Sequence, residues 1–216
     1  MSKLLTLALA VLPLLTFAQS AWKFELNGGL PYNFPMPLII KQQGHATIQT
    51  WARYFSEPLR LPVYWTIKLL RQSGSTSHEL ELMHHKLYLR NKPVDVQHFG
   101  ISHGFNILFF NRSTEKGQFT HRFGGGIIIA HPESEIRGKQ FGNAVDPYDM
   151  GYYITGPAVQ YSLNKLFPSN SIIQINTEIK LLAAYSYTPI AEGHAHVFYL
   201  GLHLIAGLQG RIYQTK

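Results

Sequence analysis

Histidine and carboxylate side chains are the groups in this chain that could bind a metal or move protons. The sequence has 11 histidines among 216 residues. Most of them lie on or beside segments with strand-like alternation: His84, His85, His98, His103, His121, His131, His194 and His196. Neutral imidazole binds transition metals, and the spacing of His194 and His196 puts both rings on one face of a strand. A lone strand histidine more often fills an interior or an interface, so both readings stay open.

Residues Ile172–Tyr187 carry a regular polar stripe. The polar members are Gln174, Asn176, Glu178 and Lys180, and they alternate with Ile173, Ile175, Ile179 and Leu181. Successive strand side chains point to opposite faces, so the polar set shares one face, which we expect to point inward. Glu178 and Lys180 can form an ion pair that fills a narrow interior.

The segment His78–Arg90 alternates less regularly. Glu79, Glu81 and His85 share one parity, whereas His84, Lys86 and Tyr88 share the other with Leu80 and Leu82. If the alternation holds, His84 and Lys86 lie on the apolar side, where a lysine can extend to the interface. If a bulge falls near Met83, Glu81 and His84 share the interior as an acid, base or metal pair.

The segment His98–Phe110 indicates which elements position these groups. Its odd positions run Phe99, Ile101, His103, Phe105, Ile107 and Phe109, and its even positions run His98, Gly100, Ser102, Gly104 and Asn106. One face is therefore apolar and aromatic, and the other is small or hydrogen-bonding. Such a strand lies between two different surroundings.

The start of the chain indicates export. Lys3 precedes an apolar run from Leu4 to Phe17 and the small-residue site Ala18-Gln19-Ser20, which predicts a signal peptide over residues 1–20 with cleavage after Ser20. The mature residues 21–216 then form one domain. The absence of Cys excludes disulfides and a lipoprotein anchor, and no later segment offers about 18 uninterrupted apolar residues.

These features predict an all-β fold, a small closed antiparallel transmembrane β-barrel in the outer membrane of a Gram-negative bacterium. Aromatic residues make up 13% of the chain and charged residues 14%, which suits a lipid-facing wall. The formal net charge of +7 is scattered and no nucleic-acid motif is visible, so we expect the basic residues to meet lipid A phosphates. We expect a monomer.

Turn residues divide the mature chain into strand-like segments. We read them as Trp22–Leu30, His45–Tyr54, Val63–Gln72, His78–Arg90, Val96–Phe110, Gln118–His131, Tyr152–Asn164, Ile172–Tyr187 and Val197–Tyr213. Bacterial single-chain barrels have an even number of strands, so we expect eight, with ten as the alternative and Trp22–Leu30 as the segment to give up. The long connections Pro31–Gly44 and His131–Met150 belong on the outer side.

Several segments resemble, in the same order, the lipid A oxidase family of outer-membrane β-barrels. They are Pro62-Val63-Tyr64, Glu79-Leu80-Glu81, His84 to Tyr88, Ile101 to Leu108 with Asn111, Gly124 to Gly126 with His131 and Glu133, Tyr153 to Ala158, and Glu178-Ile179-Lys180. The ordered set spans about residues 57 to 185. The chain departs from the family at His103, where the family has an acid, and at His85, where it has an aromatic residue.

The resemblance implies an enzyme that oxidises the proximal glucosamine of lipid A, after loss of its 1-phosphate, to an aminogluconate with molecular oxygen as co-substrate. Such an oxidation needs a base for the hydroxyl proton and an acceptor for two electrons. Protein side chains lack that acceptor, so we expect a divalent transition metal. Its candidate ligands are His84, His131 and Glu133, with Glu81 as a further donor.

The remaining roles follow from the same hypothesis. Glu178 is the candidate base or a partner of the metal ligands, and Glu81 and Asn106 complete the candidate catalytic set. The candidate contacts to lipopolysaccharide are Lys86, for the remaining lipid A phosphate, and Tyr88, Ser102 and Lys180.

Two other functions remain open from the residues. A lipid A deacylase-like hydrolase would use Ser102 with a carboxylate and a histidine from a neighbouring strand, such as His84 or His85, because His98 lies about 13 Å away along the same strand. A structural or adhesin-type barrel, or a narrow channel, would use Gly100 and Gly104 only to bend its strands.

Overall fold

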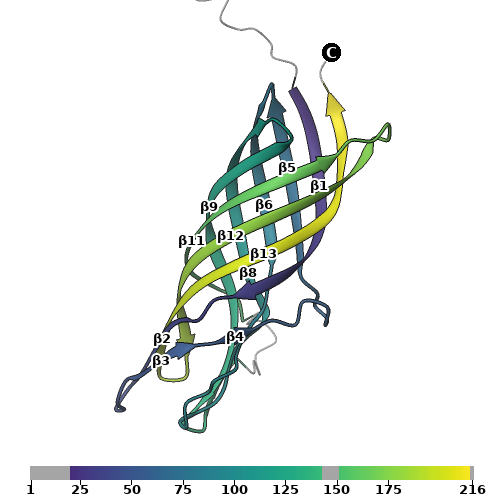
Figure 1. Ribbon diagram of the computed structural model, residues 1–216. Coiled ribbons are helices and arrows are strands. Elements are labelled where there is room, and N and C mark those ends of the chain that lie inside the picture. The colour runs from purple at the N-terminus through teal and green to yellow at the C-terminus, as the bar shows by residue number, and fades with distance from the viewer. Residues whose placement is uncertain (1–19, 143–150, 215–216) are drawn as a thin grey trace, which may run out of the picture.

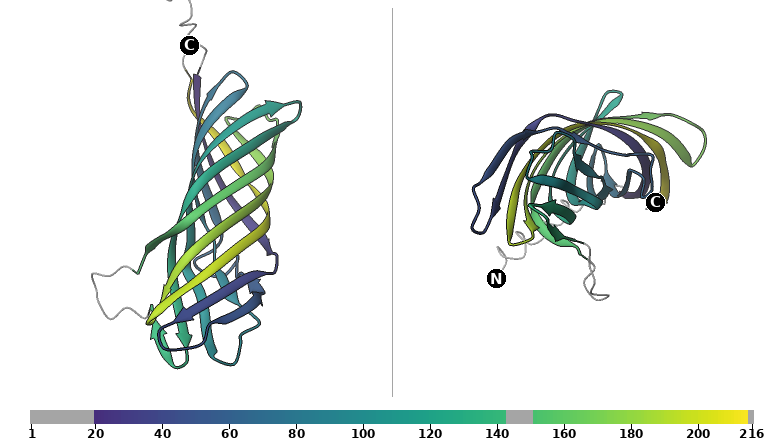
Figure 2. Two further views of the ribbon diagram at one scale, coloured as in Figure 1. Left: turned by 90° about the vertical axis from the view of Figure 1, so that its left-hand side faces the viewer. Right: turned by 90° about the horizontal axis from the view of Figure 1, so that it is seen from below.

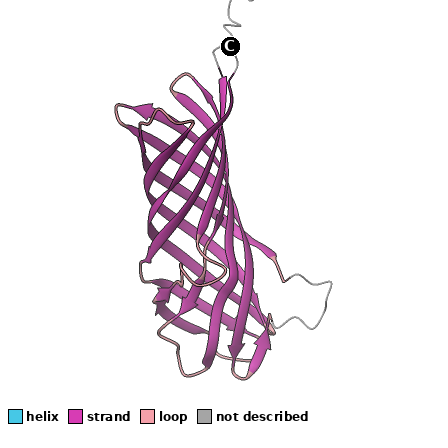
Figure 3. Cartoon of the chain, turned by 90° about the vertical axis from the view of Figure 1, so that its right-hand side faces the viewer, coloured by secondary structure: helices cyan, strands magenta, loops and turns pink. Residues whose placement is uncertain are grey.

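The computed structural model describes residues 20–142 and 151–214, and these consist of strands, turns and loops (Figure 3). The predicted signal peptide lies outside the described residues except for Ser20, the first residue of β1. In the segments described, no helix has the length and apolar character needed to cross a membrane.

Long antiparallel strands form a closed barrel (Figures 1 and 2). In the part of the chain that the structure describes, the wall contains eight of them: β1 (Ser20–Asn33), β5 (Trp65–Ser73), β6 (Thr76–His84), β8 (Val96–Lys116), β9 (Phe119–Ile136), β11 (Tyr153–Phe167), β12 (Ile173–Ile190) and β13 (Gly193–Gln214). Each pairs with its neighbours in this order. The barrel closes where β1 pairs with both β13 and β5.

The eight wall strands confirm the closed barrel and correct two segments of the sequence prediction. Trp22–Leu30, the segment to be given up, is part of β1, a full wall strand. The segment His45–Tyr54 falls on β3 (Ile48–Ala52) and β4 (Tyr54–Phe55), which pair with β2 (Met36–Gln42) and β7 (Leu87–Leu89) and stay outside the wall. Strand-like alternation does not reveal whether a strand's partners belong to the wall.

The two ends of the barrel differ. Short turns join β5 to β6, β8 to β9 and β11 to β12 at the end where β1 begins and β13 ends, which we call the turn end (Figure 1). The opposite end, the loop end, carries β2, β3, β4, β7 and β10 (Lys139–Phe141). The predicted long loop Pro31–Gly44 is instead the last part of β1 followed by β2, because apolar Leu38 and Ile40 pack into the core. The predicted loop from His131 begins as strand up to Ile136, and residues 143–150 lie outside the described chain.

An apolar belt surrounds the wall. Its members are exposed Leu, Ile, Val and Phe side chains, including Leu26, Leu69, Leu80, Phe110, Phe123, Ile127, Val159, Leu163, Ile175, Ile179, Leu204 and Leu208. The neighbouring residues along each strand point inward and are buried. A closed barrel with this surface hides every backbone edge and offers lipid an apolar exterior, as membrane-spanning barrels do.

The interior is filled by two layers of side chains. Toward the turn end it holds charged residues, namely Glu25, Lys68, Glu79, Glu81, Arg122, Glu178 and Lys180. Toward the loop end it holds apolar and aromatic residues such as Met83, Phe105, Ile107, Phe109, Ile128, Leu182 and Tyr199. These side chains occupy the space that a channel would need.

The aromatic face of His98–Phe110 points into this interior. Phe99, Phe105 and Phe109 are buried, whereas Phe110, of the opposite parity, is 62% exposed on the outside. Lipid and a packed interior are both apolar, so alternation identified the two faces of the strand but not which one faced lipid.

Candidate metal centre

The outward face of β9 changes from apolar to polar as it approaches the loop end. Phe123 and Ile127 belong to the apolar belt, and the next outward positions after Ile129 are His131 and Glu133. This sequence of residues places His131 and Glu133 on the outer wall, directly beyond the apolar belt. In a membrane barrel that level corresponds to the lipid headgroups.

A bulge in β8 adds a third polar side chain to this place. Ile101 pairs with Pro132 and Phe105 with Ala130, so three residues of β8 lie opposite the single residue His131. Gly104 within the bulge has a φ of +146°, which L-residues with a side chain rarely adopt. The bulge turns His103 outward beside His131.

His103, His131 and Glu133 form a compact group, which we call the His2Glu cluster. Their ligand atoms all lie within 4.8 Å of one another. The Nδ1 atom of His103 is 2.6 Å from Oε1 of Glu133, and Nδ1 of His131 is 3.7 Å from the same oxygen. The side chain of His103 is 62% exposed, and those of His131 and Glu133 are 12% and 21% exposed.

This donor set fits a divalent transition metal. The Nδ1 atom of His131 is buried and has no hydrogen-bond partner among residues 20–142 and 151–214, so its lone pair can coordinate an ion. Two imidazoles with one carboxylate form the facial set that leaves positions open in non-haem Fe²⁺ oxygenases. The cluster contains two of the three predicted ligands, and His103 occupies the place predicted for His84.

The His2Glu cluster opens onto a cleft of about 390 Å³. Its other walls come from the loop that follows β4 and from β7, with Phe55, Glu57, Arg60, Leu61, Pro62 and Tyr88 among the lining residues. Tyr88 stacks on Phe55 at a ring distance of 5.2 Å, and burial, followed by the charges of Glu57 and Glu133, raises the pKa of its hydroxyl. Tyr88 therefore lines the cleft, and its predicted role as a substrate contact stays a prediction.

Ser102 also lines the cleft, but its geometry is not that of a catalytic triad. Its Oγ atom lies 3.1 Å from Nδ1 of His103, the same nitrogen that contacts Glu133. A serine–histidine–acid relay uses both ring nitrogens, one toward each partner. Ser102 and Glu133 therefore compete for a single nitrogen.

Lys86 holds in place the loop around Arg60 that forms one wall of the cleft. Its Nζ atom donates a hydrogen bond to the backbone carbonyl of Arg60 at 2.9 Å, and its side chain is buried, which lowers its pKa. The backbone carbonyl of Lys86 accepts a 2.6 Å bond from Ser56. The amine is thus engaged in holding the Arg60 loop, and the exposed cation of this loop is Arg60 itself.

His84 and Asn106 lie on the same outer wall as the His2Glu cluster. The Nδ1 atom of His84 is 2.8 Å from Oδ1 of Asn106, and the His84 ring stacks on Trp65 at 5.7 Å. The pairing of β6 with β5 and β8 shows no register shift, so the alternation continues through Met83, and His85 points inward. The first of the two readings for His84 is the one observed.

Glu81, Glu178 and Lys180 lie in the charged layer of the interior. Lys180 pairs with Glu81 and lies 3.6 Å from Glu178, as the polar stripe predicted. Arg122 donates to Glu178 at 2.6 Å, and the Lys68 amine also contacts Glu178. These ion pairs hold the three side chains inside the barrel, where they help to fill the interior. Their predicted catalytic and substrate-binding roles stay predictions, without a contact that supports them.

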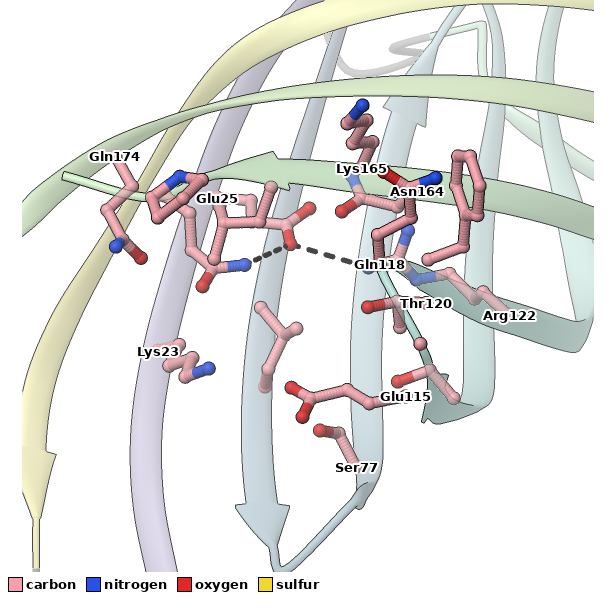
Figure 4. A pocket seen from close by; sticks show the side chains of 17 residues that line it. Lys23, Glu25, Ser77, Glu115, Gln118, Thr120, Arg122, Asn164, Lys165 and Gln174 are labelled. Carbon is pink, nitrogen blue, oxygen red and sulfur yellow. Dashed lines mark hydrogen bonds and ion pairs between the residues drawn. The ribbon is translucent and has the colours of Figure 1, made fainter.

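A second pocket, of about 430 Å³, opens at the turn end (Figure 4). Figure 4 shows Lys23, Glu115 and Gln174 around it, and a dashed line joins Glu25 to Arg122. The contact between Glu25 and Arg122 belongs to the charged layer, so this pocket ends on that layer and does not pass through the barrel.

The role of His103 was not evident from the sequence, where it counted as the loss of an acid. The available signal was Gly104, since a glycine within a strand often marks a bulge, and a bulge redirects the neighbouring side chain.

The bulge gives a testable expectation. A Cβ atom at Gly104 would lie 2.6 Å from Cγ of Asn106. We expect G104A to weaken Mn²⁺ binding about tenfold, because His103 then loses its orientation. The matched control is G125A, at a position where a Cβ atom meets nothing within 4 Å. Titration calorimetry compares the two folded variants, and equal affinities would show that the bulge does not orient His103.

Comparison with known proteins identifies no family for this chain. No protein-family model matches the chain, and no curated protein matches it. Among solved structures it is similar to Neisserial surface protein A, with 6% identity, a TM-score of 0.46, and coverage of 90% of this chain and 99% of that one. It is also similar to the outer membrane protein AlkL, with 10% identity, a TM-score of 0.49 and 90% coverage of both chains. A third similar structure is Ail of Yersinia pestis, with 8% identity, a TM-score of 0.36, and coverage of 89% of this chain and 98% of that one.

Proposed function

We propose that this protein is an outer-membrane enzyme that oxidises lipid A, converting the proximal glucosamine to an aminogluconate with molecular oxygen. The observation that carries the proposal is the His2Glu cluster on the outer wall, next to the apolar belt. A site inside a barrel would serve a solute, whereas a site on the outside at headgroup level serves a lipid that diffuses in the membrane.

The orientation of the barrel supports this substrate. Outer-membrane barrels place their short turns in the periplasm and their longer connections outside. The loop end then faces outward, and the His2Glu cluster lies at the level of the outer leaflet, which is rich in lipopolysaccharide. A sugar headgroup can enter the cleft sideways while its acyl chains stay in the membrane.

The reaction balances with groups on this face of the barrel. The lactol carbon of the sugar loses two electrons and two protons to oxygen, giving a lactone and hydrogen peroxide, and water opens the lactone to the acid. A metal bound at the cluster would supply the route for electrons to oxygen that side chains lack. Glu57, which faces the same cleft, offers a carboxylate to accept the hydroxyl proton.

Mass spectrometry of lipid A tests the proposal. Cells that express the protein, and that also remove the 1-phosphate, should show an oxygen-dependent gain of one oxygen atom on the proximal sugar. The same cells without oxygen, or without the gene, should not. An unchanged lipid A profile in air would refute the oxidase.

A hydrolase that removes an acyl chain in the same cleft is the second candidate, because Ser102, a possible nucleophile, lines that cleft. Under the oxidase proposal we expect S102A to lose no more than about tenfold in activity, because the Ser102 hydroxyl is a predicted substrate contact and not one of the cluster's three donors. Under the hydrolase alternative S102A should lose about 10⁶-fold in activity, as variants without the nucleophilic serine do. Lipid A profiles of the two strains distinguish the cases, since deacylation removes a fatty acid and oxidation adds oxygen.

A further inference from the structure

The loop from Glu57 to Val63, which we call the cleft loop, has an unusual surface. Leu59 is 82% exposed and Leu61 is 84% exposed, and Arg60 between them is also exposed. Two fully exposed leucines beside a cation are costly in water but suit the boundary between acyl chains and headgroups. The cleft loop thus combines an apolar part with a positive charge.

The fold holds the cleft loop against the wall. Lys86 donates to the carbonyl of Arg60 at 2.9 Å, and the backbone N–H of Tyr64 donates to the carbonyl of Pro58 at 2.8 Å. A turn closes between the N–H of Arg60 and the carbonyl of Glu57 at 3.2 Å. These hydrogen bonds fix the conformation in which Leu59 and Leu61 are exposed.

The cleft loop is continuous with the apolar belt and with the cleft beside the His2Glu cluster. It runs directly into β5, whose Leu69 belongs to the apolar belt. Its Arg60 and Leu61 also line the cleft onto which His103 and Glu133 open. One segment thus joins the lipid-facing surface to the metal centre.

We propose that the cleft loop inserts into the outer leaflet and binds an anionic lipid there, with Leu59 and Leu61 among the acyl chains and Arg60 on a phosphate group. The exposed guanidinium of Arg60 contacts Glu57 through Nη1 alone, at 3.2 Å, so its other N–H groups can form paired hydrogen bonds to phosphate oxygens. The amine of Lys86 is buried and already donates to the carbonyl of Arg60. The phosphate contact predicted for Lys86 therefore moves to Arg60. The identity of the lipid as substrate rests on the proposed function, whereas insertion of the loop does not.

Spin labelling tests insertion, and because the chain has no cysteine each introduced cysteine is labelled specifically. The variants L59C and L61C, and the controls L80C in the belt and V94C, carry single nitroxide labels in lipid nanodiscs. Val94 is 98% exposed in another loop of the loop end. Oxygen concentrates among acyl chains, whereas a water-soluble nickel complex stays in water. We therefore expect oxygen to relax the labels at positions 59 and 61 more than the nickel complex does, as we expect for the label at position 80. A pattern like that of V94C would overturn insertion, and this result needs neither metal nor activity.

Phosphate recognition is tested by lipid binding to the full chain in detergent. We expect R60Q to bind monophosphorylated lipid A about tenfold more weakly than the unchanged protein, while binding of fully dephosphorylated lipid A stays the same. The control K41Q replaces an exposed lysine of β2. Equal affinities of R60Q and K41Q would overturn the role of Arg60. Competition by inorganic phosphate at low millimolar concentration would show that a free anion, and not the lipid, is the ligand.

Discussion

Replacing Glu133 or His131 by alanine should remove the bound metal and lower lipid A oxidation by at least about 100-fold. Each variant removes one of the three candidate ligands. Even mutating a residue that only hydrogen-bonds a metal ligand typically lowers metal affinity or activity by about 10–100-fold. Both residues point outward, so the barrel itself should fold as before. Metal content after loading with Fe²⁺ or Mn²⁺, measured by mass spectrometry of the purified protein, checks the first effect, and lipid A profiles check the second.

The matched control for these variants is H121A. His121 is an outward histidine of the same strand, bonded to Tyr161 at 2.8 Å and far along β9 toward the turn end. We expect H121A to keep both metal and activity. Full metal content in E133A and H131A would refute the assignment of the His2Glu cluster.

His103 allows a sharper test of the same centre. H103A should lose the metal, whereas H103D should retain much of it, because a carboxylate also coordinates divalent transition metals. If both variants keep the metal equally, His103 is not a ligand and the cluster consists of a histidine and a glutamate alone.

Replacing Glu81 by leucine should destabilise the barrel by about 3–5 kcal/mol, because it leaves the buried amine of Lys180 without its closest carboxylate. Glu81 also accepts hydrogen bonds from Asn111 at 2.9 Å and Gln160 at 2.7 Å, so several partners lose their acceptor. Urea unfolding of the protein in lipid vesicles measures the change in free energy.

The double variant E81L/K180M separates packing from catalysis. It removes both charges and replaces them with apolar side chains of similar volume, so we expect it to recover the part of the stability lost through the unpaired Lys180, while Asn111 and Gln160 still lack their acceptor. Recovery of lipid A oxidation together with stability supports the packing role. A stable double variant with no oxidation would instead support the catalytic role predicted for Glu81.

The sequence predicted the interior of the barrel well where its pattern was regular. The alternation in Ile172–Tyr187 correctly placed Glu178 and Lys180 inside and their isoleucine neighbours outside, because strand side chains alternate regardless of the partners. For His84 and His85 the sequence left continued alternation and a bulge both open, and the structure shows that the alternation continues. Alternation could not tell that His45–Tyr54 stays outside the wall, since that depends on which strands pair.

The sequence by itself determined a closed membrane barrel and the parity of its strands, because these depend on local periodicity and on the need to pair every backbone edge. Only the tertiary structure decided where the chemistry lies. The bulge at Gly104 and the pairing of β8 with β9 bring His103 to His131 and Glu133, across about 30 residues of sequence. Gly104 marks a place where a bulge can form, but no local pattern encodes which residues lie opposite it, because the register follows from how whole strands pack around the barrel.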